Sequence, residues 1–482
     1  MRAPADHLFD QDAPLWAPGA SHQASWAPLS VMTGLVALSV GWLLFSPSPS
    51  SPLAWTAALS ICVPLTVALV LRPNAATIVP MLTQMALWSV PLILVGSGYE
   101  RLNGFGSASG GAAMLFLVAN LSFAWGLMAS LIRRSALLPT GPTAAVPAAD
   151  LPTGRPRGAA TTACVALSVA AAAYFAHSVG GFSAYFSNLN NTGQLTRGLT
   201  PVVWLLFFAR FAGVVVLNEA RTARLARTGI LIWVVGMILT LIVGTRLFLV
   251  LGLVELLVVL WRRRPRATRR LHPAPTHQLR RFLGFALVIL VVGSTVFAVG
   301  QFRTDLGLRH AGKAAAPTTT KSFFSSYVNN YSDTTRTAQA VTQLVPRQAP
   351  YDDGRRLLQA VTHVLPRQLR VADVRGQLLM QYLGGTRGKG SALPLPTEGF
   401  LAFGWAGTVL FMTIAGFVTG ILGERWAAQP DGSTNLALLG CLVALLLFLR
   451  GSLPVALAFG LLEVVGLVVV QRAVRGPAIT GG

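Results

Sequence analysis

The residues best suited to chemistry gather in the one long polar stretch of this sequence, residues 301–397. The stretch holds thirteen basic residues, among them Arg303, Arg309 and Arg367, against five aspartates. Guanidinium groups held in a fixed geometry bind phosphate and carboxylate groups through paired hydrogen bonds. We therefore expect an anion-binding site in this stretch, with an ordinary solvated basic face as the alternative.

Charged residues inside or between apolar runs are a second group of candidates. Arg210, Glu255 and Glu463 each lie in the middle of an apolar run. Because a charge costs roughly 2.5 to 3.5 kcal/mol at the centre of a bilayer, it usually has a partner or a task. We expect either a structural Arg–Glu pair or a binding cavity. Arg246 and Arg450 lie instead where two apolar runs meet, as anion ligands or as anchors at the membrane interface.

Carboxylates at the borders of the polar stretch are candidates for proton transfer. Glu398 follows Thr397 where an apolar run begins, so it is either a general base or a helix cap. Asp352 and Asp353 precede Gly354, a sequence more typical of a plain turn than of a catalytic site.

The spacing of the possible metal ligands predicts no metal site. His310 and His363 stand alone in the polar stretch, which is typical of a loop surface. The three cysteines, Cys62, Cys164 and Cys441, all lie inside apolar runs. Their spacing supports neither a disulfide framework nor a zinc site.

The elements that must position these residues are transmembrane helices. Of the 482 residues, 53% are hydrophobic and 11% are charged, whereas soluble domains carry roughly 25% charged residues. The hydrophobic residues form runs close to the roughly 20 residues that cross a bilayer as a helix. We predict an all-α integral membrane protein, a polytopic bundle of about 12 transmembrane helices. The predicted runs are 27–46, 53–71, 77–97, 111–132, 159–178, 199–218, 228–244, 246–261, 281–300, 398–421, 434–449 and 452–471.

The basic residues predict which side of the membrane each connection occupies. With a cytoplasmic N-terminus, 20 of the 38 basic residues lie inside and only 4 lie in short outer connections, as the positive-inside rule requires. The net charge of +22 is then mainly topogenic, and nucleic-acid binding is not expected. The N-terminal tail lacks the basic start and early apolar stretch of a cleaved signal peptide. We expect both termini in the cytoplasm and the polar stretch outside.

The predicted order has four helices before a Pro- and Ala-rich linker, five helices after it, an outer loop that is partly helical, and three final helices. The segments are 1–26 (cytoplasmic tail), 27–132 (helices), 133–158 (cytoplasmic linker), 159–300 (helices), 301–397 (outer loop), 398–471 (helices) and 472–482 (cytoplasmic tail).

Three motifs together resemble one family. Gly244-Thr245-Arg246, between two apolar runs, is similar to the Gly-Ser-Arg signature of bacterial O-antigen and oligosaccharide repeat-unit polymerases, the Wzy-type glycan polymerases. Tyr-Asp-Asp-Gly at 351–354, eleven residues before Leu365-Pro366-Arg367, is similar to the family's passage of an aromatic residue, a glycine, a short helix and Ile-Pro-Arg. Thr-Glu-Gly-Phe at 397–400, which continues into Phe403-Gly404 and Gly407, is similar to the family's start of the next helix.

The likeness covers roughly residues 228 to 425 and is incomplete. Ala402 occupies the position where the family usually has Asn, and the Lys-Pro that often follows the Pro-Arg is missing after Arg367. These differences concern the acceptor side of the site more than the fold.

The resemblance implies a membrane glycosyltransferase on the outer side of the bacterial cytoplasmic membrane. It would transfer a growing glycan from polyprenyl pyrophosphate to a sugar hydroxyl of the next lipid-linked repeat unit. Arg246 and Arg367 would hold the pyrophosphate, with Arg210 and Arg450 as further candidates. Glu398 would be the general base.

Further residues and partners follow from the same resemblance. Arg303 and Arg309 are additional substrate-binding candidates, and Asp352, Asp353 and His363 are substitutes for the base. No cofactor or metal is required. The expected partners are the lipid-linked oligosaccharide, the bilayer, a chain-length regulator and a flippase. An O-antigen ligase-like transferase, which depends on a loop histidine, and a transporter or flippase of lipid-linked sugars are the alternatives.

Overall fold

The described part of the chain is a bundle of apolar helices. The computed structural model describes residues 52–71, 74–96, 110–137, 157–181, 199–220, 222–241, 246–262, 333–363, 393–428, 435–451 and 453–475. In these ranges seven helices are long and apolar enough to cross a membrane, and three shorter apolar helices accompany them. Each overlaps a predicted run, which confirms a helical membrane protein. The runs 27–46 and 281–300 lie outside the described residues, so the total of about twelve stays a prediction.

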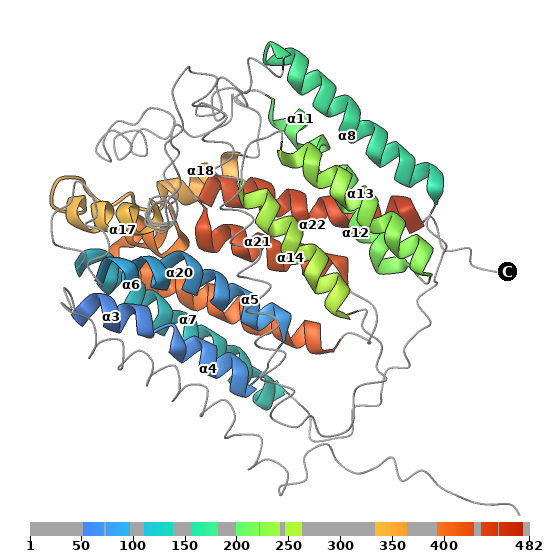
Figure 1. Ribbon diagram of the computed structural model, residues 1–482. Coiled ribbons are helices and arrows are strands. Elements are labelled where there is room, and N and C mark those ends of the chain that lie inside the picture. The colour runs from blue at the N-terminus through green and yellow to red at the C-terminus, as the bar shows by residue number, and fades with distance from the viewer. Residues whose placement is uncertain are drawn as a thin grey trace, which may run out of the picture.

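One group of helices gathers the N-terminal part of the described chain around α7 and α20, which pack on each other (Figure 1). It consists of α3 (Pro52–Leu59), α4 (Cys62–Leu71), α5 (Ala75–Gln84), the π-helical turn η1 (Met85–Ser89), α6 (Val90–Gly96), α7 (Gly110–Leu137) and α20 (Leu395–Ala427). Gly126 of α7 and Gly416 of α20 lie where these two helices cross, and a side chain on either would collide with the facing backbone. Such small residues let helices pack closely in lipid, where no hydrophobic drive brings them together.

A second group contains the middle of the chain and the last helix (Figure 1). It consists of α8 (Gly158–Ser178), α11 (Thr200–Leu205), α12 (Phe208–Glu219), α13 (Ala223–Leu241), α14 (Arg246–Arg262) and α22 (Leu453–Arg475). Gly213 and Gly229 bring α12 and α13 into backbone contact. α12 also packs against α8, α14 and α22, which makes it the centre of this group.

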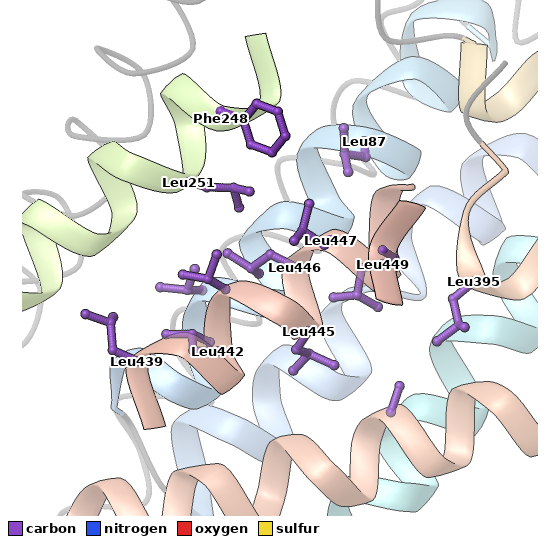
Figure 2. Packing of buried hydrophobic residues seen from close by; sticks show 14 of the residues in the cluster. Leu87, Phe248, Leu251, Leu395, Leu439, Leu442, Leu445, Leu446, Leu447 and Leu449 are labelled. Atoms are coloured by element: carbon purple, nitrogen blue, oxygen red, sulfur yellow. The ribbon is translucent and has the colours of Figure 1, made fainter. Parts of the chain in front are cut away.

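The helix α21 (Leu436–Arg450) joins the two groups, because it packs against α22 and α14 on one side and α20 and α5 on the other. Figure 2 shows its leucines leaving the helix in several directions, with Leu446 and Leu447 toward α14 and Leu445 away from it. A helix that is apolar on all sides is expected at the centre of a membrane bundle.

The helix expected at 398–421 differs from the prediction. α20 spans 33 residues, but Phe403 and Gly404 have non-helical backbone angles. The Thr408 hydroxyl donates to the carbonyl of Pro396 at 3.1 Å, although a straight helix would separate these residues by about 18 Å. α20 is therefore a short segment, 395–402, folded back against a long segment, 405–427.

Two helices of the polar stretch close one end of the bundle. These are α17 (Asp333–Leu344), which packs on α7, and α18 (Arg355–His363), which packs on α22. The Gln339 side-chain oxygen accepts a hydrogen bond from the Ala112 N–H at 2.9 Å. This donor lies in the first turn of α7 and has no partner within its own helix. The loop thus satisfies a backbone group that lipid could not.

The opposite end of the bundle joins segments that are predicted to be cytoplasmic. The Arg157 N–H, just before α8, donates to the carbonyl of Val474 at 2.8 Å. The Arg475 guanidinium pairs with Glu219 at the end of α12. The start of α8 and the ends of α12 and α22 therefore lie together, away from α17 and α18.

Candidate functional site

The candidate site forms where the turn at 351–354 packs on the short segment of α20. The backbone N–H groups of Asp352 and Asp353 donate to the carbonyls of Leu401 and Ala402, at 2.8 and 3.1 Å. The carbonyls in the last turn of a helix have no partner within the helix. The turn supplies these partners, so the two segments form one hydrogen-bonded unit.

Two glycines allow this close approach. Gly354 has φ of 76°, and a Cβ there would lie 2.8 Å from the Phe403 ring. Gly404 has φ of 65°, and a Cβ there would lie 2.9 Å from the Tyr351 hydroxyl. The ring of Tyr351 also meets that of Phe400, with centroids 6.1 Å apart. L-residues rarely adopt positive φ, so both glycines are required by backbone shape and by space.

This hydrogen-bonded unit contains a buried ion pair between Arg356 and Glu398. The Arg356 Nε donates to Glu398 Oε2 at 2.7 Å and its terminal Nη2 donates to Oε1 at 3.0 Å. The Arg356 side chain is 9% exposed and that of Glu398 is 2% exposed. This is the paired geometry in which a guanidinium holds a carboxylate most firmly. The pair joins α18 to the short segment of α20.

The predicted turn at Asp352 is confirmed, and it also positions Arg356. Asp353 has φ of 51°, and one oxygen of the Asp352 carboxylate accepts from the Arg356 N–H at 2.7 Å. Asp352 thereby caps the start of α18, as aspartate commonly does. Asp352 is buried, whereas Asp353 is exposed.

Glu398 does act as a helix cap, but for another helix. Its Oε1 accepts from the N–H of Leu453 at 3.1 Å, the first residue of α22. A carboxylate at this position satisfies an unpaired donor and favours the positive end of the helix. The contact brings the site to the junction of α21 and α22, where Arg450 ends α21 and is partly buried.

The sequence did not single out Arg356 among the thirteen basic residues of the polar stretch. One signal was available, because Arg356 lies four residues after Asp352 in the first turn of the predicted short helix. An arginine there is fixed in direction by the turn before it. Its partner, Glu398, is 42 residues away in the sequence. Glu398 was selected as a candidate for a different reason, and only the fold brings the two side chains together.

Arg210, Glu255 and Glu463 form a second cluster inside the membrane. The Arg210 Nη2 contacts Glu255 Oε1 at 3.3 Å and also pairs with Glu463, and all three side chains are fully buried. The guanidinium carbon lies 4.8 and 5.0 Å from the ring centroids of Phe207 and Phe211. The structure therefore contains the structural Arg–Glu pair, extended to two glutamates.

This cluster is separate from the Arg356–Glu398 pair. Glu463 follows Leu453 by ten residues on α22, which places it about 15 Å further along the helix. Arg210 therefore lies deep in the bundle with both glutamates as partners, away from the end where α17 and α18 lie.

The start of α14 lies at the same end as the Arg356–Glu398 pair. Phe248 of α14 and Phe459 of α22 are in contact, with ring centroids 4.7 Å apart. Further along, Glu255 and Glu463 meet through Arg210. The two helices therefore run in the same direction, so Arg246, the first residue of α14, begins at the end where α22 begins.

The remaining predicted residues lie outside the described side chains. Arg303, Arg309, His310 and Arg367 belong to ranges that are not described, and only the backbone is described for Arg246 and His363. Their assignments to substrate stay predictions. No protein family matches the chain, and no curated protein or solved structure matches it either. The geometry alone thus offers a paired cation and carboxylate at the boundary between loop and bundle.

Proposed function

We propose that this chain is a membrane glycosyltransferase that polymerises polyprenyl-pyrophosphate-linked oligosaccharide repeat units outside the cytoplasm. The main support for the proposal is that two of the three motifs that resemble the polymerases contact each other in the fold. The segments 351–354 and 397–407 are distant in sequence, yet they hydrogen-bond to each other and hold the Arg356–Glu398 pair. The third motif, at Arg246, begins α14 at the same end of the bundle.

The chemistry of the proposed reaction suits this position. The leaving group is a pyrophosphate at the membrane surface, and guanidinium groups stabilise such charge through fixed, paired hydrogen bonds. We assign Arg356 to this group, together with Arg246, Arg367 and Arg450. We assign Arg210 a structural role in helix packing. It is completely buried and already contacts two carboxylates, so a ligand at the membrane surface would not reach it.

Glu398 keeps its assignment as general base, with an added condition. Both of its oxygens accept hydrogen bonds from Arg356, and Oε1 also accepts from Leu453. In our proposal the incoming pyrophosphate draws the Arg356 guanidinium away from Glu398. The freed carboxylate then accepts the proton of the acceptor hydroxyl as that oxygen bonds to the anomeric carbon. The bond to pyrophosphate breaks, and its electron pair leaves with polyprenyl pyrophosphate.

The direct test is to incubate the purified protein in detergent with lipid-linked repeat units. We expect a ladder of glycans on a gel. Unchanged substrate beside an active polymerase control would contradict the proposal. A transporter would leave the repeat units intact but move them across a vesicle membrane, which a second assay with sealed vesicles detects.

Variants of single residues test the assignments. Arg246→Ala should abolish the ladder while the amount of folded protein stays unchanged. Glu398→Gln should abolish the ladder from the protein that does fold, although it also lowers the yield of folded protein because Arg356 loses its buried counter-charge. Arg355→Ala is the matched control, because Arg355 neighbours Arg356 in α18 but is exposed. A ladder of normal intensity from Arg246→Ala would refute the pyrophosphate assignment of that residue.

A further inference from the structure

The helix α18 has three distinct edges. Arg356 and Ala360, four residues apart, face the protein and are buried. Leu358 and Val361, three residues apart, are 55% and 60% exposed. Residues three or four apart share one edge of a helix. Arg355 lies on the third edge, which is polar and exposed.

The exposed side chains of Leu358 and Val361 are apolar, although the helix belongs to a polar loop. In water they would remain apolar surface without a partner. No described residue covers them, and the burial of Ala360 on the neighbouring edge shows that the helix is already docked. The apolar edge is therefore not the one that holds α18 to the bundle.

The surroundings of α18 identify what the apolar edge contacts. The helix packs on α22 and α20, and each of these helices exposes apolar residues near the same end. Phe403 and Trp405 of α20 are 45% and 42% exposed, and Val455 of α22 is 41% exposed. Exposed apolar residues on spanning helices face lipid, and aromatic residues are enriched at the membrane interface.

From this continuity we infer that α18 lies in the lipid–water interface of the membrane, with Leu358 and Val361 in contact with lipid acyl chains. A helix with one apolar and one polar edge commonly lies in the membrane plane at this depth. Arg355 then faces the headgroups and water. This placement does not depend on the proposed reaction.

The placement has a consequence for the access of ligands. Arg356 lies on the buried edge of the same short helix, so its guanidinium stands at the level of the lipid headgroups. An anionic headgroup would reach the Arg356–Glu398 pair sideways from the leaflet, without its acyl chain leaving the bilayer.

Spin labels test the placement of α18 in the intact chain. Cys62, Cys164 and Cys441 are replaced by alanine, and Leu358→Cys, Val361→Cys and Arg355→Cys are introduced one at a time. Each protein is labelled, reconstituted in lipid nanodiscs, and compared with the cysteine-free protein in thermal stability. The measurement is the accessibility of each label to oxygen, which concentrates in hydrocarbon, and to a nickel chelate, which stays in water.

We expect the labels at 358 and 361 to favour oxygen and the label at 355 to favour the nickel chelate. Equal preference for the nickel chelate at all three positions would overturn the inference, because α18 would then lie in water. Low accessibility to both reagents at 358 and 361 would overturn it as well, because another protein segment would then cover this edge.

Discussion

At the scale of single residues, the Arg356–Glu398 pair determines how the loop joins the bundle. One carboxylate receives two bonds from α18 and one from the first residue of α22. Each group is buried, so each depends on the other. Removing one partner of a buried pair leaves an uncompensated charge and destabilises a protein by about 3 to 5 kcal/mol.

Arg356→Ala should therefore lower the thermal stability of the purified protein markedly, whereas Arg355→Ala should leave it nearly unchanged. Arg355 is exposed, and charges there contribute about 0 to 1 kcal/mol. Unfolding midpoints in one detergent provide the comparison. Equal midpoints for the two variants would show that the pair contributes nothing to stability.

The cluster inside the membrane leads to a second prediction at this scale. Arg210→Ala leaves two buried carboxyl groups without a cation, so we expect little folded protein. Glu463→Gln preserves the shape and leaves Arg210 paired with Glu255, so we expect folded protein in near-normal yield. Size-exclusion chromatography after detergent extraction measures both. Equal loss in the two variants would indicate that shape, and not charge balance, sets the requirement.

At the scale of elements, the reversal within α20 positions Glu398. The short and long segments touch at two glycines, since a Cβ on Gly399 would lie 2.6 Å from the carbonyl oxygen of Gly407. The reversal itself occurs at Phe403 and Gly404. Without it Glu398 would stand about one and a half turns above the long segment and away from Leu453.

Gly404→Ala tests this reversal. Gly404 has φ of 65° and ψ of −146°, a region open almost only to glycine, where other residues are strained by about 1 to 3 kcal/mol. We expect a clear drop in thermal stability, because the added methyl group also meets Tyr351. Gly158→Ala is the control, since nothing lies within 4 Å of a Cβ at that position. A stability equal to that of this control would argue against the reversal.

At the scale of the whole molecule, the two ends of the bundle separate the predicted sides of the membrane. The Arg157–Val474 and Arg475–Glu219 contacts join segments predicted to be cytoplasmic. Glu398, Leu453 and α18 meet at the other end. An orientation derived from basic residues in the sequence thus agrees with the arrangement of the helices. Which end faces the cytoplasm stays a prediction.

Labelling in whole cells tests that orientation. In the chain without native cysteines, Arg355→Cys and Arg157→Cys each place one thiol at an exposed position, at opposite ends of the bundle. A maleimide that cannot cross membranes should label Arg355→Cys in intact cells and Arg157→Cys only after the cells are opened. The reverse pattern would invert the predicted topology and would place the candidate site in the cytoplasm.

The sequence alone determined the class of the protein, the approximate positions of the ten apolar spans in the described ranges, and the turn at 351–354. These features follow from local composition, because a bilayer selects apolar runs of a given length and an Asp-Asp-Gly sequence favours a turn. The sequence was enough to select Glu398 as a candidate, because it is a carboxylate at the border between the polar stretch and an apolar run. It was not enough to identify the partner of Glu398.

Only the tertiary structure decided that Arg356 is that partner, that Glu398 caps α22, and that α20 reverses at Gly404. The same is true of the two carboxylates that share Arg210. The reversal brings together Thr408 and Pro396, which are 12 residues apart within one apolar run. Each of the other features joins side chains or backbone groups that are far apart in the chain. Such pairs depend on which helix ends the packing brings together, and composition and spacing along one segment hold no information about that choice.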